Sequence, residues 1–103
     1  MTYNELKDAI ESVQHAVSDD ACNVLDYILD RYSDEDEDID EYDVYDAIIE
    51  ECDSYLIYYS DAWEYLSSNN ITDFDEAIAE GNKDVCSIAC YYLTQEINEN
   101  IRL

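Results

Sequence analysis

Apolar residues recur along this chain at the spacing of an α-helix and not at that of a strand. A Thr2–Glu5 capping box opens the first segment. A second segment restarts at Ser18 or Asp19. The inward-facing residues of the two segments are Leu6, Ile10, Val13, Val17, Ala21, Val24, Leu25, Ile28 and Leu29. Together the segments predict a helical hairpin over residues 3–32.

A strongly acidic run from Ser33 to Glu41 interrupts this pattern. We expect it to form a loop or the first turn of the next helix, because acidic side chains suit a helix N-terminus. From Asp40 to Ser67 the helical period resumes. A phase slip there predicts two helices with a bend near Asp53–Ser54. The predicted inward stripes are Val44, Ala47, Ile48 and Cys52, followed by Leu56, Tyr59, Trp63 and Leu66.

The last third of the chain predicts two more helices. A short one runs over Thr72–Glu80 and is stopped by Gly81, and Asn82 is expected to cap the final helix. Its predicted inward residues are Val85, Ile88, Ala89, Tyr92, Leu93 and Ile97. With one glycine and no proline, the chain has few turn signals for a sheet. We therefore predict a single all-α domain of five to six helices over residues 1–103, because a chain of this length has room for one core.

Charge changes this picture from a generic helical domain to a specialised one. The chain has 28 acidic and 4 basic residues, a formal net charge of −24. Duplex DNA carries one charge per ~1.7 Å, so 24 charges correspond to roughly 12 base pairs. Disorder is not expected, since 48% of the residues are hydrophobic. The charge predicts a basic partner and an acidic surface, and it argues against direct binding to nucleic acid or to anionic membranes.

The acids expected to make this contact are concentrated in the first half of the chain. Twelve of the twenty residues from Asp34 to Asp53 are Asp or Glu. Helix neighbours three or four positions apart stand ~5–6 Å from each other, close to the spacing of phosphates along one strand. The predicted partner-binding residues are Asp26, Asp30, Asp34, Glu35, Asp36, Glu37, Asp38, Asp40, Glu41, Asp43, Asp46, Glu50, Asp53 and Asp61.

No constellation of residues typical of an enzyme occurs in the sequence. His15 is the only histidine and is expected at the surface or at its boundary, and one glycine cannot build a phosphate-binding loop. We therefore expect a protein that is not an enzyme and that needs no cofactor.

Metal sites are the more serious alternative. Asp34, Asp36, Asp38 and Asp40 alternate as calcium-loop ligands do, but Ile39 replaces the glycine of that motif and Tyr45 its glutamate. A zinc site could use the four cysteines, Cys22, Cys52, Cys86 and Cys90. Free cysteines that pack in the core of a cytosolic protein are the favoured interpretation, and no metal is expected.

Aromatic residues are unusually dense around the predicted bend. Tyr55, Tyr58, Tyr59, Trp63 and Tyr65 are too many for all to face one core. Aromatic residues dominate interface hot spots, although they also shield the cores of small proteins. We expect a homodimer, whose contact would involve Tyr59, Trp63 and Leu66.

These features resemble the Ocr ("overcome classical restriction") family of phage anti-restriction proteins. The resemblance rests on Tyr45–Ile48, on Tyr58–Trp63, on Ile71 with the acidic run to Gly81, and on the opening Met1–Asn4. It implies an all-helical homodimer whose carboxylates copy the phosphates of bent duplex DNA and fill the DNA groove of type I restriction–modification enzymes. The chain departs from the family by ending in Asn100–Leu103 without an acidic tail and by carrying an acidic run at Asp34–Asp43.

The leading functional hypothesis is a DNA-mimicking, anti-restriction inhibitor that serves evasion of host defence. Alternatives are an anti-CRISPR inhibitor of a Cas effector and an acidic adaptor or chaperone for a basic DNA-binding protein. An ion-binding protein and adaptation to high salt are further alternatives. The sequence contains neither an apolar stretch of ~20 residues nor a signal-peptide pattern. We expect a cytoplasmic protein, in the host bacterial cytoplasm if a phage encodes it.

Overall fold

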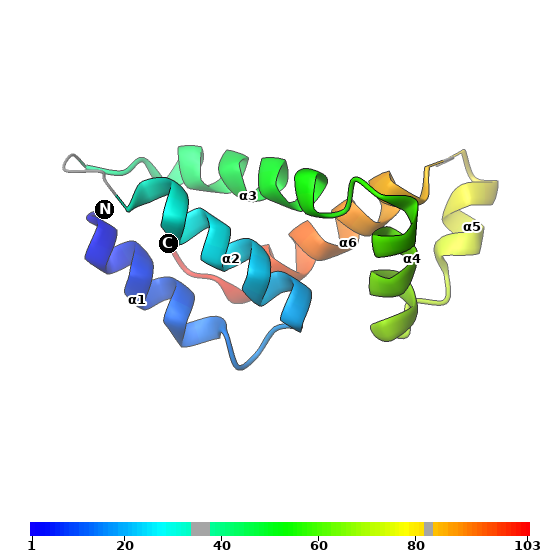
Figure 1. The fold of residues 1–103 in the computed structure, drawn as a ribbon, viewed down its shortest axis with the longest axis horizontal. Helices are drawn as coiled ribbons and strands as arrows, with labels where there is room; N and C mark the ends of the chain where they lie inside the picture. The colour runs from blue at the N-terminus through cyan, green and yellow to red at the C-terminus, as the bar shows by residue number, and fades with distance from the viewer. Residues whose placement is uncertain (34–37, 82–83) are drawn as a thin grey trace.

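The computed structural model describes residues 1–33, 38–81 and 84–103 and is all-helical over these ranges (Figure 1). This confirms the predicted fold class. The helices are α1 (Tyr3–Val13), α2 (Asp19–Tyr32), α3 (Glu41–Tyr55), α4 (Tyr59–Ser68), α5 (Phe74–Ala79) and α6 (Val85–Asn100). None of the helices in these ranges combines the length and the apolar character that crossing a bilayer requires.

The last helix organises the core. In Figure 1, α6 starts near α4 and α5 at one end of the molecule and leads back to the opposite end, where both termini and α1 lie. α6 contacts α2, α3, α4 and α5, and α3 also packs along α2. Leu25, Ile48, Leu93 and Ile97 are fully buried among these helices. The result is an elongated body of 45 × 23 × 20 Å.

Local capping signals account for most of the helix starts. Thr2 and Glu5 form the predicted capping box of α1, Ser18 caps α2, and Asp40 caps α3. The prediction for α6 is wrong: Asp84 is its N-cap, and its carboxylate accepts a hydrogen bond from the Cys86 amide at 2.9 Å. Asn82, the predicted cap, lies outside the described residues. Because Asp and Asn cap helices equally well, the pattern alone did not separate them.

The predicted bend exists, but it lies a few residues later than expected. α3 continues to Tyr55, and the chain turns over residues 56–58 before α4 begins. α5 ends at Ala79, two residues before Gly81, which has a φ of +117°. This positive φ explains why the only glycine of the chain stands where that helix ends.

The predicted inward stripe of α4 is partly wrong. The structure buries Ala62, Tyr65 and Leu66, which follow one another at positions i, i+3 and i+4. Tyr59 and Trp63 are instead exposed by 62% and 44%. The break after α3 resets the helical phase, so a stripe extended across it from Leu56 selected the wrong face.

Candidate partner-binding surface

The exposed side of α3 carries a row of carboxylates, which we call the acidic ridge: Asp43, Asp46, Glu50 and Asp53. All four are exposed. They lie opposite the buried stripe of the same helix, whose members are Val44, Ala47, Ile48 and Cys52. The structure therefore presents these acids together on one helix, as the sequence predicted. Asp26 and Asp30 are exposed on the neighbouring α2.

One member of the acidic ridge already has a basic partner. Arg31 of α2 donates a hydrogen bond to Glu50 at 2.9 Å and lies 3.9 Å from Glu51. The row of unpaired carboxylates expected along α3 is therefore interrupted at Glu50. Sequence reasoning missed this pair because its members stand on different helices, nineteen positions apart.

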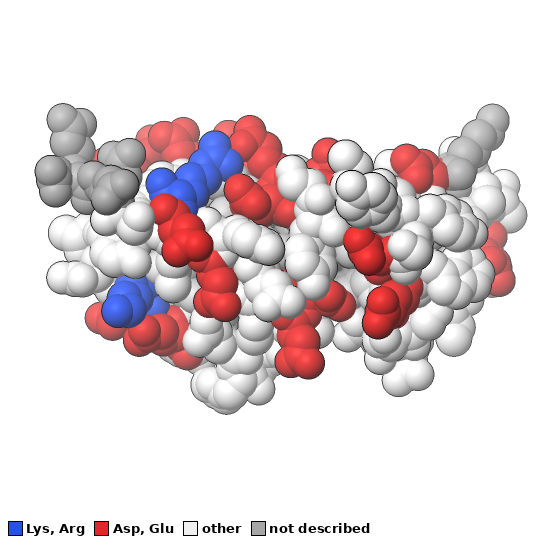
Figure 2. Space-filling model, in the orientation of Figure 1, with Lys and Arg blue, Asp and Glu red and all other residues white. Residues whose placement is uncertain are grey.

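The few basic side chains are unevenly distributed. The described ones are Lys7 in α1, Arg31 in α2 and Arg102 after α6, whereas Lys83 lies outside the described ranges. On the face shown in Figure 2, blue atoms occur only in the left half, near α1 and α2, and red atoms extend along the whole length. Among the described residues of α4 and α5, no lysine or arginine offsets the carboxylates.

The acidic run before α3 lies largely outside the described residues. Four of its predicted partner-binding acids are not described: Asp34, Glu35, Asp36 and Glu37. Asp38 accepts a hydrogen bond from the Met1 amine, and Asp40 accepts one from the Tyr42 amide at 2.9 Å. Glu41 is exposed in the first turn of α3. The two described members of the calcium-like run thus fasten the N-terminal segment and cap a helix.

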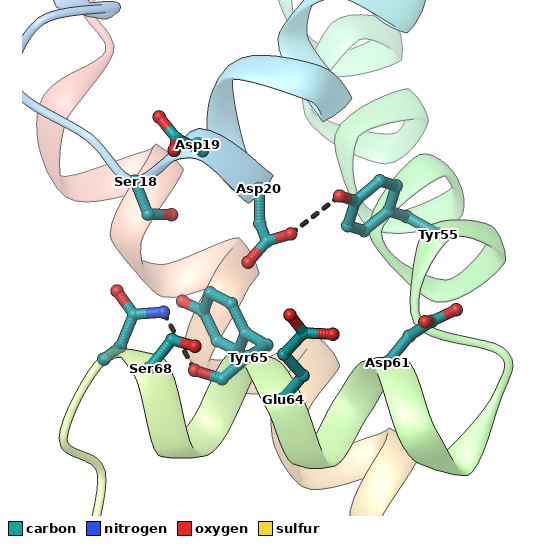
Figure 3. A pocket seen from close by; sticks show the side chains of 9 residues that line it. Ser18, Asp19, Asp20, Tyr55, Asp61, Glu64, Tyr65 and Ser68 are labelled. Carbon is teal, nitrogen blue, oxygen red and sulfur yellow. Dashed lines mark hydrogen bonds between the residues drawn. The ribbon is translucent and has the colours of Figure 1, made fainter.

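A second group of acids, not found from the sequence, lines a cavity between α2 and α4. This acidic cavity has a volume of about 490 Å³. Its lining residues are Ser18, Asp19, Asp20, Tyr55, Asp61, Glu64, Tyr65, Ser68 and Asn69. In Figure 3, Asp20 extends from α2 and Glu64 from α4 into the same space. The fold therefore brings Asp61, one of the predicted residues, together with Asp19, Asp20 and Glu64, which were not among the predicted partner-binding residues.

Hydrogen bonds fix the walls of the acidic cavity. The Tyr55 hydroxyl donates to Asp20 at 2.7 Å, and the Ser18 hydroxyl donates to Glu96 of α6 at 2.7 Å. The Tyr65 hydroxyl also donates to Glu96, at 3.3 Å. These bonds tie α2, α3, α4 and α6 together, so the carboxylates at the mouth project from a rigid frame.

The two tyrosines of this frame resist ionisation. Burial, followed by the hydrogen bond to Asp20, raises the pKa of Tyr55 above its ordinary value. Burial and the negative charge of Glu96 raise the pKa of Tyr65 more strongly. Both phenols therefore stay protonated and act as donors across the physiological pH range.

We expect the fold to lose stability in alkali. Unfolded tyrosine ionises near pH ~10. Above that pH the native state keeps protons that the unfolded state has lost, so the free energy of unfolding must fall as pH rises through the native pKa values. Urea unfolding followed by circular dichroism, at about pH 8 and above about pH 10, checks this. Tyr65→Phe should show a shallower decline than the parent, and an equal decline in the two proteins would contradict the assignment to Tyr65.

Other candidate residues are placed more plainly. His15 is exposed, as expected. The four cysteines are not joined by disulfides, and burial raises the pKa of Cys52 to about 12. Over the described ranges, no group of three or more His, Cys, Asp or Glu side chains is placed so that it could hold a metal ion.

Of the predicted dimer residues, Tyr59 and Trp63 are exposed, whereas Leu66 is fully buried in the core and is not available to a partner.

Comparison with known proteins adds no relative. No protein-family profile, curated protein or solved structure matches this chain. The function of this chain is therefore inferred from its charge, its shape and the placement of its side chains.

Proposed function

We propose that this protein is a DNA-mimicking inhibitor that occupies the DNA-binding groove of a bacterial defence nuclease. A type I restriction–modification enzyme is the first candidate target, and the protein itself has no catalytic activity. The acidic ridge, Asp26, Asp30 and the carboxylates of the acidic cavity form the contact. In this role the protein meets the basic groove in place of nucleic acid and protects incoming DNA from restriction.

The observation that carries this proposal is the match of charge to length. The molecule is 45 Å long and has a net charge of −24, about one charge per 1.9 Å of its long axis. Duplex DNA carries one charge per ~1.7 Å. A groove lined with lysine and arginine to neutralise DNA therefore meets a similar charge over a similar length when it meets this protein.

Rigidity strengthens the proposal. The exposed carboxylates project from helices that share one core, and the walls of the acidic cavity are joined by hydrogen bonds. A preformed charged surface binds without the ordering cost of a flexible acidic tail. Association should be fast and should weaken as salt rises, because its long-range component is electrostatic.

Two alternatives keep the same surface and change the partner. A Cas effector also holds DNA in a basic channel, so an anti-CRISPR role uses the same contacts. A basic DNA-binding protein that is chaperoned by this chain would be bound in the same way but without loss of nuclease activity. The lack of lysine and arginine among the described residues of α4 and α5 favours a contact that includes this end of the molecule in each case.

Cleavage assays under competition test the proposal. DNA cleavage by a type I restriction–modification enzyme and by a Cas effector is measured with increasing protein, at several DNA and salt concentrations. We expect inhibition that more DNA relieves and that higher salt weakens. Inhibition that DNA concentration does not alter would show that the protein acts away from the DNA groove.

The homodimer stays a prediction and has its own measurement. Light scattering over a range of salt concentrations distinguishes a 12.0 kDa particle from a dimer. We expect any dimer to tighten as salt rises, because screening reduces the repulsion between two copies of charge −24. A 12.0 kDa particle at every salt concentration would remove the dimer.

A further inference from the structure

Three aromatic side chains contact one another in series from the core to the surface at the α4–α5 end. Phe74 is 8% exposed, Trp63 44% and Tyr59 62%. The Trp63 and Phe74 rings meet edge to face, with centroids 5.1 Å apart, and Tyr59 lies nearly parallel to Trp63 at 6.0 Å. Trp63 packs against the buried Phe74 ring, and Tyr59 packs against Trp63. The exposed Tyr59–Trp63 pair is thus organised before any partner arrives.

Both helices at this end of the molecule, α4 and α5, carry carboxylates. On α4 itself, Asp61 and Glu64 line the acidic cavity. On α5, Asp75 and Glu76 directly follow Phe74 and are exposed. Over the described residues of these two helices there is no basic side chain. A group resting on the pair therefore enters a negative field, and a cation is the occupant with complementary charge.

The size of the pair also limits the occupant. A stable protein interface buries about 800 Å² on each partner. A large aromatic side chain buries about 150–250 Å² when fully covered. Two such rings, each about half exposed, offer only a fraction of the area that a dimer contact needs. The pair is the right size for one flat side chain.

Arginine fits this place better than lysine. Its guanidinium is planar, is more weakly hydrated than an ammonium group and stacks on aromatic faces. Its five donors can also reach a neighbouring carboxylate while the plane rests on a ring. We propose that the Tyr59–Trp63 pair, at the acidic α4–α5 end, receives an arginine side chain of the basic partner. This inference rests on the proposed function, since that arginine would belong to the DNA-binding groove.

Peptide binding tests the inference without knowledge of the natural target. The probes are arginine and lysine homopolymers of equal length, and Trp63 is the reporter because it is the only tryptophan of the chain. We expect the arginine peptide to bind about two- to fivefold more tightly, the ratio that one exposed cation–π contact gives. It should also change Trp63 fluorescence more than the lysine peptide does.

Matched variants locate the preference. Tyr59→Leu, and Tyr59→Leu combined with Trp63→Leu, should bind both peptides equally by calorimetry, at the affinity of the parent for the lysine peptide. Tyr42→Leu, which removes a 79% exposed tyrosine on α3, should keep the preference. Circular dichroism confirms folding, and the single variant at exposed Tyr59 serves as the test if the double variant unfolds.

The possible outcomes separate this inference from the proposed function. Equal binding of the two peptides by the parent overturns the arginine site, as does a preference that persists in folded Tyr59→Leu. Light scattering that shows a dimer, with Trp63 shielded from a neutral quencher, assigns the pair to a second copy and also overturns it. Failure of both peptides to bind at low salt counts instead against the proposed function.

Discussion

The triple variant Asp43→Asn, Asp46→Asn and Asp53→Asn is expected to inhibit the target nuclease about tenfold less well than the parent. Each of these exposed carboxylates contributes about 0.5 kcal/mol to a contact with a basic groove, so three contribute about 1.5 kcal/mol. Glu50 is left unchanged because Arg31 already pairs with it. The inhibition constant for DNA cleavage measures the effect, and circular dichroism checks folding.

Neutralising the acidic cavity as well should deepen the loss. Asp19→Asn, Asp61→Asn and Glu64→Gln remove three more charges without touching the hydrogen bond between Tyr55 and Asp20. The six changes together are expected to cost about 3 kcal/mol, roughly a hundredfold in the inhibition constant. The inhibition constant should also rise less steeply with salt concentration than that of the parent, because fewer charges take part in the contact.

A charge-matched control separates placement from total charge. Asp8→Asn, Glu11→Gln and Glu99→Gln also remove three negative charges, from exposed positions on α1 and α6. We expect this control to inhibit within about twofold of the parent, since its charges act only through the long-range field. If this control inhibits as poorly as the triple variant of Asp43, Asp46 and Asp53, net charge alone determines binding. If the variant with all six changes in the acidic ridge and the acidic cavity folds and inhibits as well as the parent, DNA mimicry is ruled out.

Leu66→Ala is expected to destabilise the fold by about 2–5 kcal/mol, the usual cost of truncating a buried leucine. Leu66 is fully buried on the same face of α4 as Ala62 and Tyr65. The shortened side chain leaves a cavity that the surrounding helices can close only in part. Urea unfolding measures the change, and a protein of this size has little stability to spare.

Leu66→Met provides the matched control for this core position. Its volume is close to that of leucine, so it should cost less than about 1.5 kcal/mol and leave the oligomeric state unchanged. If Leu66→Ala instead kept the stability of the parent and altered the particle mass in light scattering, Leu66 would belong to a dimer contact. That result would contradict the assignment of Leu66 to the core of a single protomer.

The sequence by itself determined the helices and most of their ends. The apolar period in α1, α2 and α3 records which side chains leave water, and this local preference survives in the fold. Caps such as Thr2 and Ser18 act within one turn, so they can be recognised without knowledge of the rest of the chain. The exposed acids of α3 follow for the same reason, because a helix with one apolar side must present the other side to solvent.

Only the tertiary structure decided what depends on contacts between distant segments. The break at residues 56–58 set the phase of α4, which placed Tyr65 in the core and Tyr59 at the surface. The acidic cavity joins Asp20 to Glu64, and the pair of Arg31 with Glu50 removes one charge from the ridge. Helical periodicity describes each helix about its own axis and carries no information on how two axes are placed. Packing around α6 supplied that placement, and with it the arrangement of carboxylates on which the proposed function rests.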